Sequence, residues 1–117
     1  MATDWEQAAE RGDVLAAADL AAAALAQSPG DPDVALAALV CQSNAGRSEE
    51  VFDIFLNDPS VAQDPKGFAS LIYSIAVNGA LELVGTFNLY PAMEQVLQWH
   101  PAPVSYTHLT LPTISSV

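Results

Sequence analysis

Basic residues are scarce in this sequence. Lysine and arginine together number 3 against 14 aspartate and glutamate residues, so the formal net charge is −11 at pH 7. Binding to nucleic-acid phosphates requires clustered Lys and Arg, and anionic membrane surfaces attract the same groups. The basic residues, Arg11, Arg47 and Lys66, lie far apart in the chain. The composition therefore predicts a protein whose partner is neither nucleic acid nor a membrane.

Cysteine and long apolar runs are also lacking. Cys41 is the only cysteine, which excludes an internal disulfide and a metal site built from several cysteines. No apolar run approaches the roughly 18 residues of a membrane-spanning helix. The first residues, Met1–Asp4, lack the basic start and apolar stretch of a signal peptide. We therefore expect a cytoplasmic protein in which Cys41 is a small core residue.

Residues that could carry chemistry each have a structural explanation. The sequence contains no phosphate-binding glycine loop, nucleophile elbow or His/Cys ligand cluster. The acidic pairs Asp31/Asp33 and Glu49/Glu50 fall at expected helix starts, where carboxylates cap the helix and complement its dipole. His100 falls at an expected helix end without an acid or metal partner beside it. We therefore expect no catalytic residue, metal or cofactor, and no enzyme activity.

Apolar spacing indicates an all-α fold. Strong helix formers dominate the first part of the chain, and the alternating β-branched pattern of strands is missing. Caps, prolines and glycines predict six helices: 4–11, 14–27, 34–44, a short one from Ser48, 65–84 and 88–99. A loop is expected at 57–64, and Gly85 is expected to separate the last two helices. Thr3 and Glu6 form a capping box, and Asn88 is the expected cap of the sixth helix.

The helices form three pairs with equivalent positions. Gly12 and Gly46 lie 34 residues apart, each in the turn inside a pair. The second helix combines small residues with a terminal proline, at Ala17, Ala21, Ala24, Leu25 and Pro29. This pattern resembles the tetratricopeptide repeat family over about residues 1–102, most specifically over 12–31. The resemblance implies antiparallel helix pairs stacked as a right-handed solenoid.

The sequence also departs from that family. Its first-helix signature, W-x2-L-G-x2-Y, is absent, because Trp5 and Leu39 stand where the small glycine is expected. In the second unit, Asp58 and Gln63 replace the small residue and the proline. These departures leave open another helical-hairpin array or a nonrepetitive helical bundle.

The resemblance implies a scaffold that binds a protein or peptide and performs no chemistry of its own. In the family, the first helices of the pairs line a concave surface, which here places Leu36, Val40, Asn44 and Tyr73 in the partner-binding groove. Some members clamp a terminal carboxylate with Lys and Arg, and this sequence lacks such a clamp. We therefore expect a basic or apolar partner segment. The alternative is the N-terminal helical region of a larger bacterial enzyme, such as a glycosyl- or methyltransferase.

The last residues of the sequence, 104–117, differ in origin from the rest by the codons that could encode them. One permitted codon series for Val104–Thr113 is GTC TCT TAT ACA CAT CTG ACG CTG CCG ACG, which matches a transposase-type sequencing adapter in one frame. We therefore expect the natural protein to run to about Ala102, cut there by the read, and residues 103–117 to form no domain.

Overall fold

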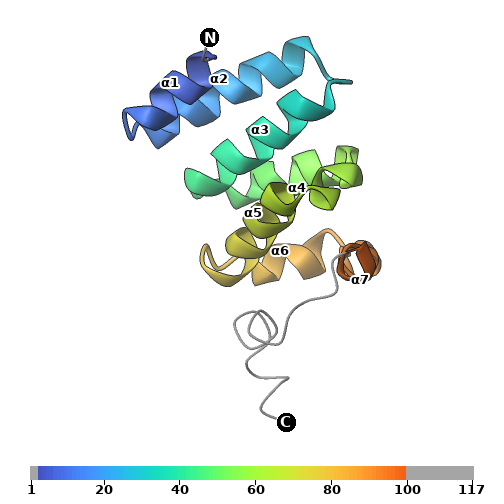
Figure 1. Ribbon diagram of the computed structural model, residues 1–117. Coiled ribbons are helices and arrows are strands. Elements are labelled where there is room, and N and C mark those ends of the chain that lie inside the picture. Colours follow the sequence, from blue (N-terminus) through green and yellow to red (C-terminus); the bar gives the residue numbers. More distant parts are fainter. Residues whose placement is uncertain (1–2, 100–117) are drawn as a thin grey trace.

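The computed structural model describes residues 3–99, and every regular element in that range is a helix (Figure 1). The elements are α1 (Asp4–Glu10), α2 (Val14–Gln27), α3 (Pro32–Asn44), α4 (Ser48–Asn57), the 3₁₀ helix η1 (Pro59–Gln63), α5 (Pro65–Ala76), α6 (Leu81–Thr86) and α7 (Tyr90–Trp99). The all-α prediction is confirmed for this range. The expected non-domain tail at 103–117 and His100 lie outside the described residues.

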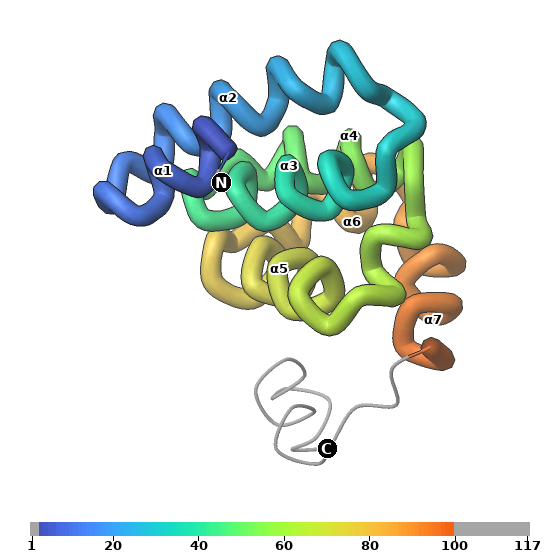
Figure 2. Tube along the Cα trace, turned by 45° about the horizontal axis from the view of Figure 1, so that its top comes forward, coloured from blue at the N-terminus to red at the C-terminus, as the bar shows by residue number. Residues whose placement is uncertain are grey.

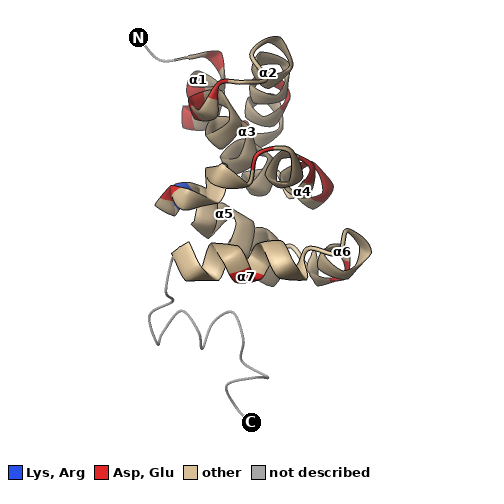
Figure 3. Cartoon of the chain, turned by 90° about the vertical axis from the view of Figure 1, so that its right-hand side faces the viewer, with Lys and Arg blue, Asp and Glu red and all other residues tan. Residues whose placement is uncertain are grey.

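The helices stack along the molecule. α2 packs against α1 and α3, and α3 also packs against α4 and α5. Seen edge-on, α1 and α5 lie toward one side, and α2, α4 and α6 lie toward the other (Figure 3). α1 and α7 lie at opposite ends (Figures 1 and 2), so these two helices do not close a bundle.

Local capping explains where most of the early helices begin. The Thr3 hydroxyl accepts a hydrogen bond from the backbone N–H of Glu6 at 3.3 Å, which is one half of the predicted capping box, and donates to Glu6 Oε1 at 2.9 Å. The Asp31 carboxylate accepts from the N–H groups of Asp33 and Val34, and Pro32 occupies the first turn. α4 starts at Ser48 as expected, although its N-cap is Arg47 and makes no side-chain cap bond.

Two apolar clusters hold the stack together. One, between α1, α2 and α3, is built from small residues: Ala8, Ala17, Ala18, Ala21, Ala38 and Cys41. Small side chains let paired helices approach closely. Burial raises the pKa of the Cys41 thiol, as expected for a core cysteine. The second cluster is larger and joins Phe52 and Phe55 of α4 to Phe68 and Ile72 of α5 and to α7.

The expected boundaries after α5 are wrong. α5 ends at Ala76, not near Val84, because Gly79 adopts a φ of +67°, a conformation that L side chains rarely adopt and that breaks the helix. Gly85 lies inside α6 and does not separate two helices.

The break between α6 and α7 comes instead at Asn88. Its φ of +53° places it in the left-handed region, so it ends α6 and does not cap the following helix. The N–H of Leu89 then donates to the Val84 carbonyl at 2.8 Å. Both side chains are buried in the larger cluster, so packing fixes a turn that the sequence pattern did not indicate.

The segment expected as a loop at 57–64 contains η1. The Asp58 carboxylate accepts from the backbone N–H of Ser60 at 3.2 Å, and Val61 and Ala62 are buried. η1 lies directly against α5 at Gly67. A Cβ on Gly67 would lie 2.0 Å from the Val61 carbonyl oxygen and 3.0 Å from Leu36 Cδ1. Only glycine allows this approach.

Hydrogen bonds between side chains and backbone fasten α3 to α5. The Ser43 hydroxyl donates to the Ser70 carbonyl at 2.9 Å and accepts from the Ser74 hydroxyl at 3.1 Å. The Asn78 amide donates to the Ser43 carbonyl at 3.2 Å. Ser43 and Ser74 are buried, so these bonds fix the position of one helix on the other.

We predict that Gly67→Ala lowers the free energy of unfolding by roughly 1–3 kcal/mol, because the new methyl group collides with the Val61 backbone. Gly85→Ala is the matched control. Its Cβ would meet only the Tyr90 hydroxyl at an ordinary 3.7 Å, and removing a helical glycine stabilises by about 0.5–1 kcal/mol. Urea unfolding of both variants measures the difference, and equal stability of the two would contradict the packing described for η1 and α5.

We also predict that Ser43→Ala costs about 1–3 kcal/mol and that Ser74→Ala costs less, because only the first change removes the bond to the Ser70 carbonyl. The double variant should be close to Ser43→Ala alone. Thermal unfolding of the four proteins forms a double-mutant cycle. Additive losses would show that the two hydroxyl groups act independently.

Candidate binding surfaces

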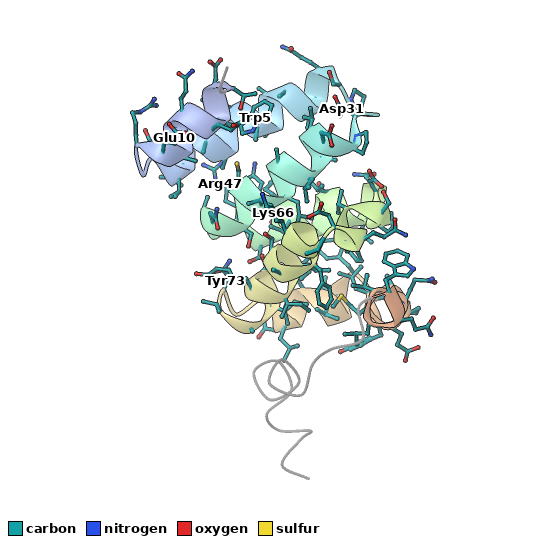
Figure 4. The ribbon with its side chains drawn as sticks, viewed as in Figure 1. Trp5, Glu10, Asp31, Arg47, Lys66 and Tyr73 are labelled. Carbon is teal, nitrogen blue, oxygen red and sulfur yellow. The ribbon has the colours of Figure 1, made fainter. Side chains whose placement is uncertain are left out.

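The surface predicted from the sequence lies on α3 and α5. Leu36, Val40 and Asn44 are four residues apart and share one side of α3. Leu36 and Val40 are half-buried, and Asn44 is exposed. Tyr73 is 45 % exposed on α5, and Figure 4 shows it pointing away from the helices. The structure therefore brings the four residues onto two neighbouring helices.

Leu36 serves in part to pack those helices. Its Cδ1 lies close to Gly67, so it is seated at the α3–α5 contact. Leu36 therefore contributes to helix packing, and its place in the partner-binding groove stays a prediction. Tyr73 and Asn44 remain the exposed members of the stripe.

A groove that the sequence analysis missed lies between α2 and α4. Its volume is about 600 Å³, within the range of ligand pockets in proteins. Its lining residues come from α2, α3, α4 and the turns that follow α2 and α4: Ala22, Leu25, Ala26, Pro29, Ala35, Gln42, Glu50, Asp53, Ile54, Asn57 and Asp58. α3 contributes Ala35 and Gln42 to the groove.

The groove and the predicted stripe occupy different sides of α3. At 3.6 residues per turn, Ala35 and Gln42 point in nearly the same direction, about 150° away from the mean direction of the predicted stripe. The edge-on view agrees, because α2 and α4 lie on the side away from α5 (Figure 3). The two surfaces are therefore separate.

The groove combines an apolar side with an acidic side. Leu25 of α2 and Ile54 of α4 are partly buried hydrophobic residues packed against the core clusters. Glu50, Asp53 and Asp58 line the α4 side, and no lysine or arginine lines the groove. Figure 3 shows acidic residues on α4 at the outer side of the molecule. The groove is therefore suited to a ligand that is both cationic and apolar.

Two of these carboxylates have no side-chain partner, although Glu50 lies in the first turn of α4, where the helix dipole favours negative charge. Within residues 3–99, neither Glu50 nor Asp53 forms an ion pair or a side-chain hydrogen bond. The carboxylate of Asp58, by contrast, accepts bonds from the backbone and hydroxyl of Ser60. Arg47 is not available to neutralise the carboxylates of the groove, because its guanidinium pairs with the Asp19 carboxylate at 2.6 Å.

Gln42 is a polar residue in a core position. It is 1 % exposed, and its Nε2 donates to the Ala18 carbonyl at 2.9 Å. Its Oε1 is buried and has no hydrogen-bond partner among the described residues. Leaving a buried acceptor unpaired costs about 1–3 kcal/mol. Since Gln42 also lines the groove, the structure contains a buried acceptor beside space for a ligand.

A smaller groove of about 430 Å³ lies between α1 and α2. It is lined by Thr3, Asp4, Trp5, Leu20, Ala23, Ala24 and Gln27. Trp5 also packs against the small-residue cluster, so it contributes to the contact between the two helices. This groove holds one carboxylate, that of Asp4.

The acidic pairs Asp31/Asp33 and Glu49/Glu50 occupy different positions at the starts of their helices. The Asp31 carboxylate is an N-cap, whereas Glu49 and Glu50 lie in the first turn of α4. Among residues 3–99, no group of three or more His, Cys, Asp or Glu side chains is placed to hold a metal ion. No helix in the same range is long and apolar enough to cross a membrane.

One sequence signal did point to the missed groove. Gln42 lies three residues after Leu39 and seven after Ala35, on the core side of α3, where an apolar residue is expected. A polar residue in such a position requires a partner. The groove itself was invisible in the sequence, because it arises only where three helices meet.

Comparison of the chain with protein-family models, with curated proteins and with solved structures gives no match in any of the three.

Proposed function

We propose that this protein is a tetratricopeptide-like helical scaffold that binds a segment of a partner polypeptide and performs no chemistry of its own. The observation that carries the proposal is Tyr73, an aromatic side chain left 45 % exposed on α5 directly beside the buried Ser74. Tyrosine is enriched at protein interfaces because its ring contributes apolar area while its hydroxyl hydrogen-bonds.

The packing next to Tyr73 favours a surface that is already ordered before a partner binds. The neighbouring residue, Ser74, is fully buried and bonded to Ser43, and Gly67 seats the start of α5 against η1. A surface that is already ordered loses less conformational freedom on binding. Tyr73, Asn44 and Val40 then form a surface that a partner segment contacts without rearrangement of α3 or α5.

The stacking of helices supports the repeat part of the proposal. α3 contacts α2, α4 and α5, as a helix in the middle of stacked hairpins does. In this proposal the array is a right-handed solenoid, and α1, α3 and α5 are the first helices of its pairs. The third pair is irregular, because α6 and α7 replace one longer helix.

The net charge of the protein limits which partner segments it attracts. With a net charge of −11, the chain repels acidic segments and attracts basic ones over the Debye length of about 8–10 Å at physiological salt. The exposed stripe is itself uncharged, so an apolar or aromatic side chain of the partner makes the direct contact. A basic or apolar partner segment fits both the long-range charge of the protein and the uncharged surface at the contact.

We predict that Tyr73→Ala weakens binding of peptides selected from a random phage-displayed library at least tenfold. Truncation of an aromatic residue at the centre of an interface commonly costs about 2 kcal/mol or more. Tyr90→Ala is the matched control, since Tyr90 is 59 % exposed on α7, away from the stripe. Titration calorimetry with each variant measures the change.

The two tyrosines separate specific binding from general stickiness. If Tyr90→Ala weakens binding as much as Tyr73→Ala, the selected peptides adhere to exposed apolar residues and the α3–α5 surface is not the site. If no peptide is selected above background, the scaffold proposal is wrong for these residues.

A further inference from the structure

We propose that the groove between α2 and α4 is a second binding site, which takes a short basic and partly apolar segment of a polypeptide. This goes beyond the binding proposed for the α3–α5 surface, because the groove lies on the other side of α3. Four independent features of the groove support it: its charge, its apolar side, its length and its buried acceptor.

The charge of the groove selects a cation. Within residues 3–99, Glu50 and Asp53 form no ion pair, and no basic residue lines the groove. α2 and α4 also both end here, at Gln27 and Asn57, and neither has a basic residue in its last turn. Helix C-termini carry partial negative charge. The field of Asp53 therefore adds to that of the helix ends, and an incoming lysine or arginine near them neutralises both.

The apolar side suits the stem of such a side chain. Leu25, Ala26 and Ile54 line the groove beside the carboxylates. The methylene groups of lysine and arginine lie along apolar surface while the charged end stays at a polar rim. A neighbouring apolar residue of the ligand would cover the rest of this side.

The groove is elongated, which favours a chain over a single small cation. Glu50, Asp53 and Asn57 line it at successive turns of α4. With a rise of 1.5 Å per residue, Glu50 and Asn57 are about 10 Å apart along the helix. An extended peptide covers that length with about three residues.

The buried acceptor gives the groove a specific polar contact. Gln42 is held in place by its bond to the Ala18 carbonyl, and its Oε1 has no partner. A backbone or side-chain N–H of the ligand would supply the missing donor. This contact is available only to a ligand inside the groove, so it distinguishes binding there from attraction to the acidic surface.

Fluorescence anisotropy with a labelled hexapeptide of alternating leucine and arginine tests the proposal. Glu50→Gln with Asp53→Asn should weaken its binding at least tenfold. Glu82→Gln with Glu94→Gln removes the same charge from α6 and α7, outside the groove, and should change affinity less than twofold. A hexapeptide of alternating leucine and glutamate should not bind.

Equal losses in the two double variants would show non-specific attraction to an acidic protein and overturn the proposal. Displacement of the hexapeptide by an equal concentration of spermidine would also overturn it, in favour of a small polyamine. Amide shifts of ¹⁵N-labelled protein locate the peptide. Shifts confined to Val40, Asn44 and Tyr73 would refute the groove while leaving the α3–α5 surface intact, and shifts at Ala22, Gln42 and Asp53 would support it.

Gln42→Leu separates a binding role from a packing role. The substitution removes the unpaired buried acceptor, so the melting temperature should stay the same or rise. Affinity for the hexapeptide should nevertheless fall at least threefold, because the contact at the base of the groove is lost. Unchanged affinity in a folded Gln42→Leu protein would overturn the assignment of this acceptor to the ligand.

Discussion

The packing of α3 is the constraint on which the rest of the structure depends. α3 contacts α2, α4, α5 and η1, so four neighbouring elements must fit around one helix. Ala38 and Ala18 permit the approach of α2, and Gly67 permits the approach of η1 to α5 beside Leu36. Because these contacts use small residues, they release little free energy per residue, and the Phe and Leu side chains of the larger cluster must supply most of the stability.

Two adjacent polar residues of α3 show how burial separates structural from binding roles. Ser43 is buried with both its donor and acceptor satisfied by α5. Gln42 is equally buried, and one of its two groups is satisfied by α2 while the other is not. A satisfied buried group contributes to rigidity, whereas an unsatisfied one weakens the fold. The cost at Gln42 is consistent with a group kept for a ligand and not for packing.

A helix boundary could be predicted from the sequence where the residues that cause it lie within a few positions of it along the chain. The starts of α1 and α3 follow from Thr3 and Asp31, whose side chains bond residues two or three positions on. The start of α1 was predicted correctly, whereas α3 begins at Pro32, two residues before the expected start. The end of α6 depends on Asn88 taking a left-handed conformation while Leu89 is buried against distant helices. Apolar periodicity contains no such information, so Gly85 was wrongly chosen as the break.

The same limit applied to the candidate surfaces. The assignment of Leu36, Val40, Asn44 and Tyr73 to a partner-binding groove came from the resemblance to the tetratricopeptide repeat family, and it stays a prediction. The groove was not predictable, because Leu25, Gln42 and Asp53 are distant in sequence and converge only after α2, α3 and α4 pack. The polar residue Gln42 at a core position of α3 was the one sign of the groove in the sequence. It indicates that a hydrogen-bond partner is required but not which one.

The acidic character of the chain acts on the two surfaces in different ways. At the surface proposed beside Tyr73, the long-range field would bring basic segments close, while the direct contact would be uncharged. In the groove, Glu50 and Asp53 take part directly, so an acidic ligand would leave like charges facing each other across an apolar floor. Like-charge juxtaposition costs several kcal/mol, roughly, in a partly desolvated interface. In the proposed site the carboxylates would therefore disfavour acidic ligands, so selectivity by charge would not require high affinity.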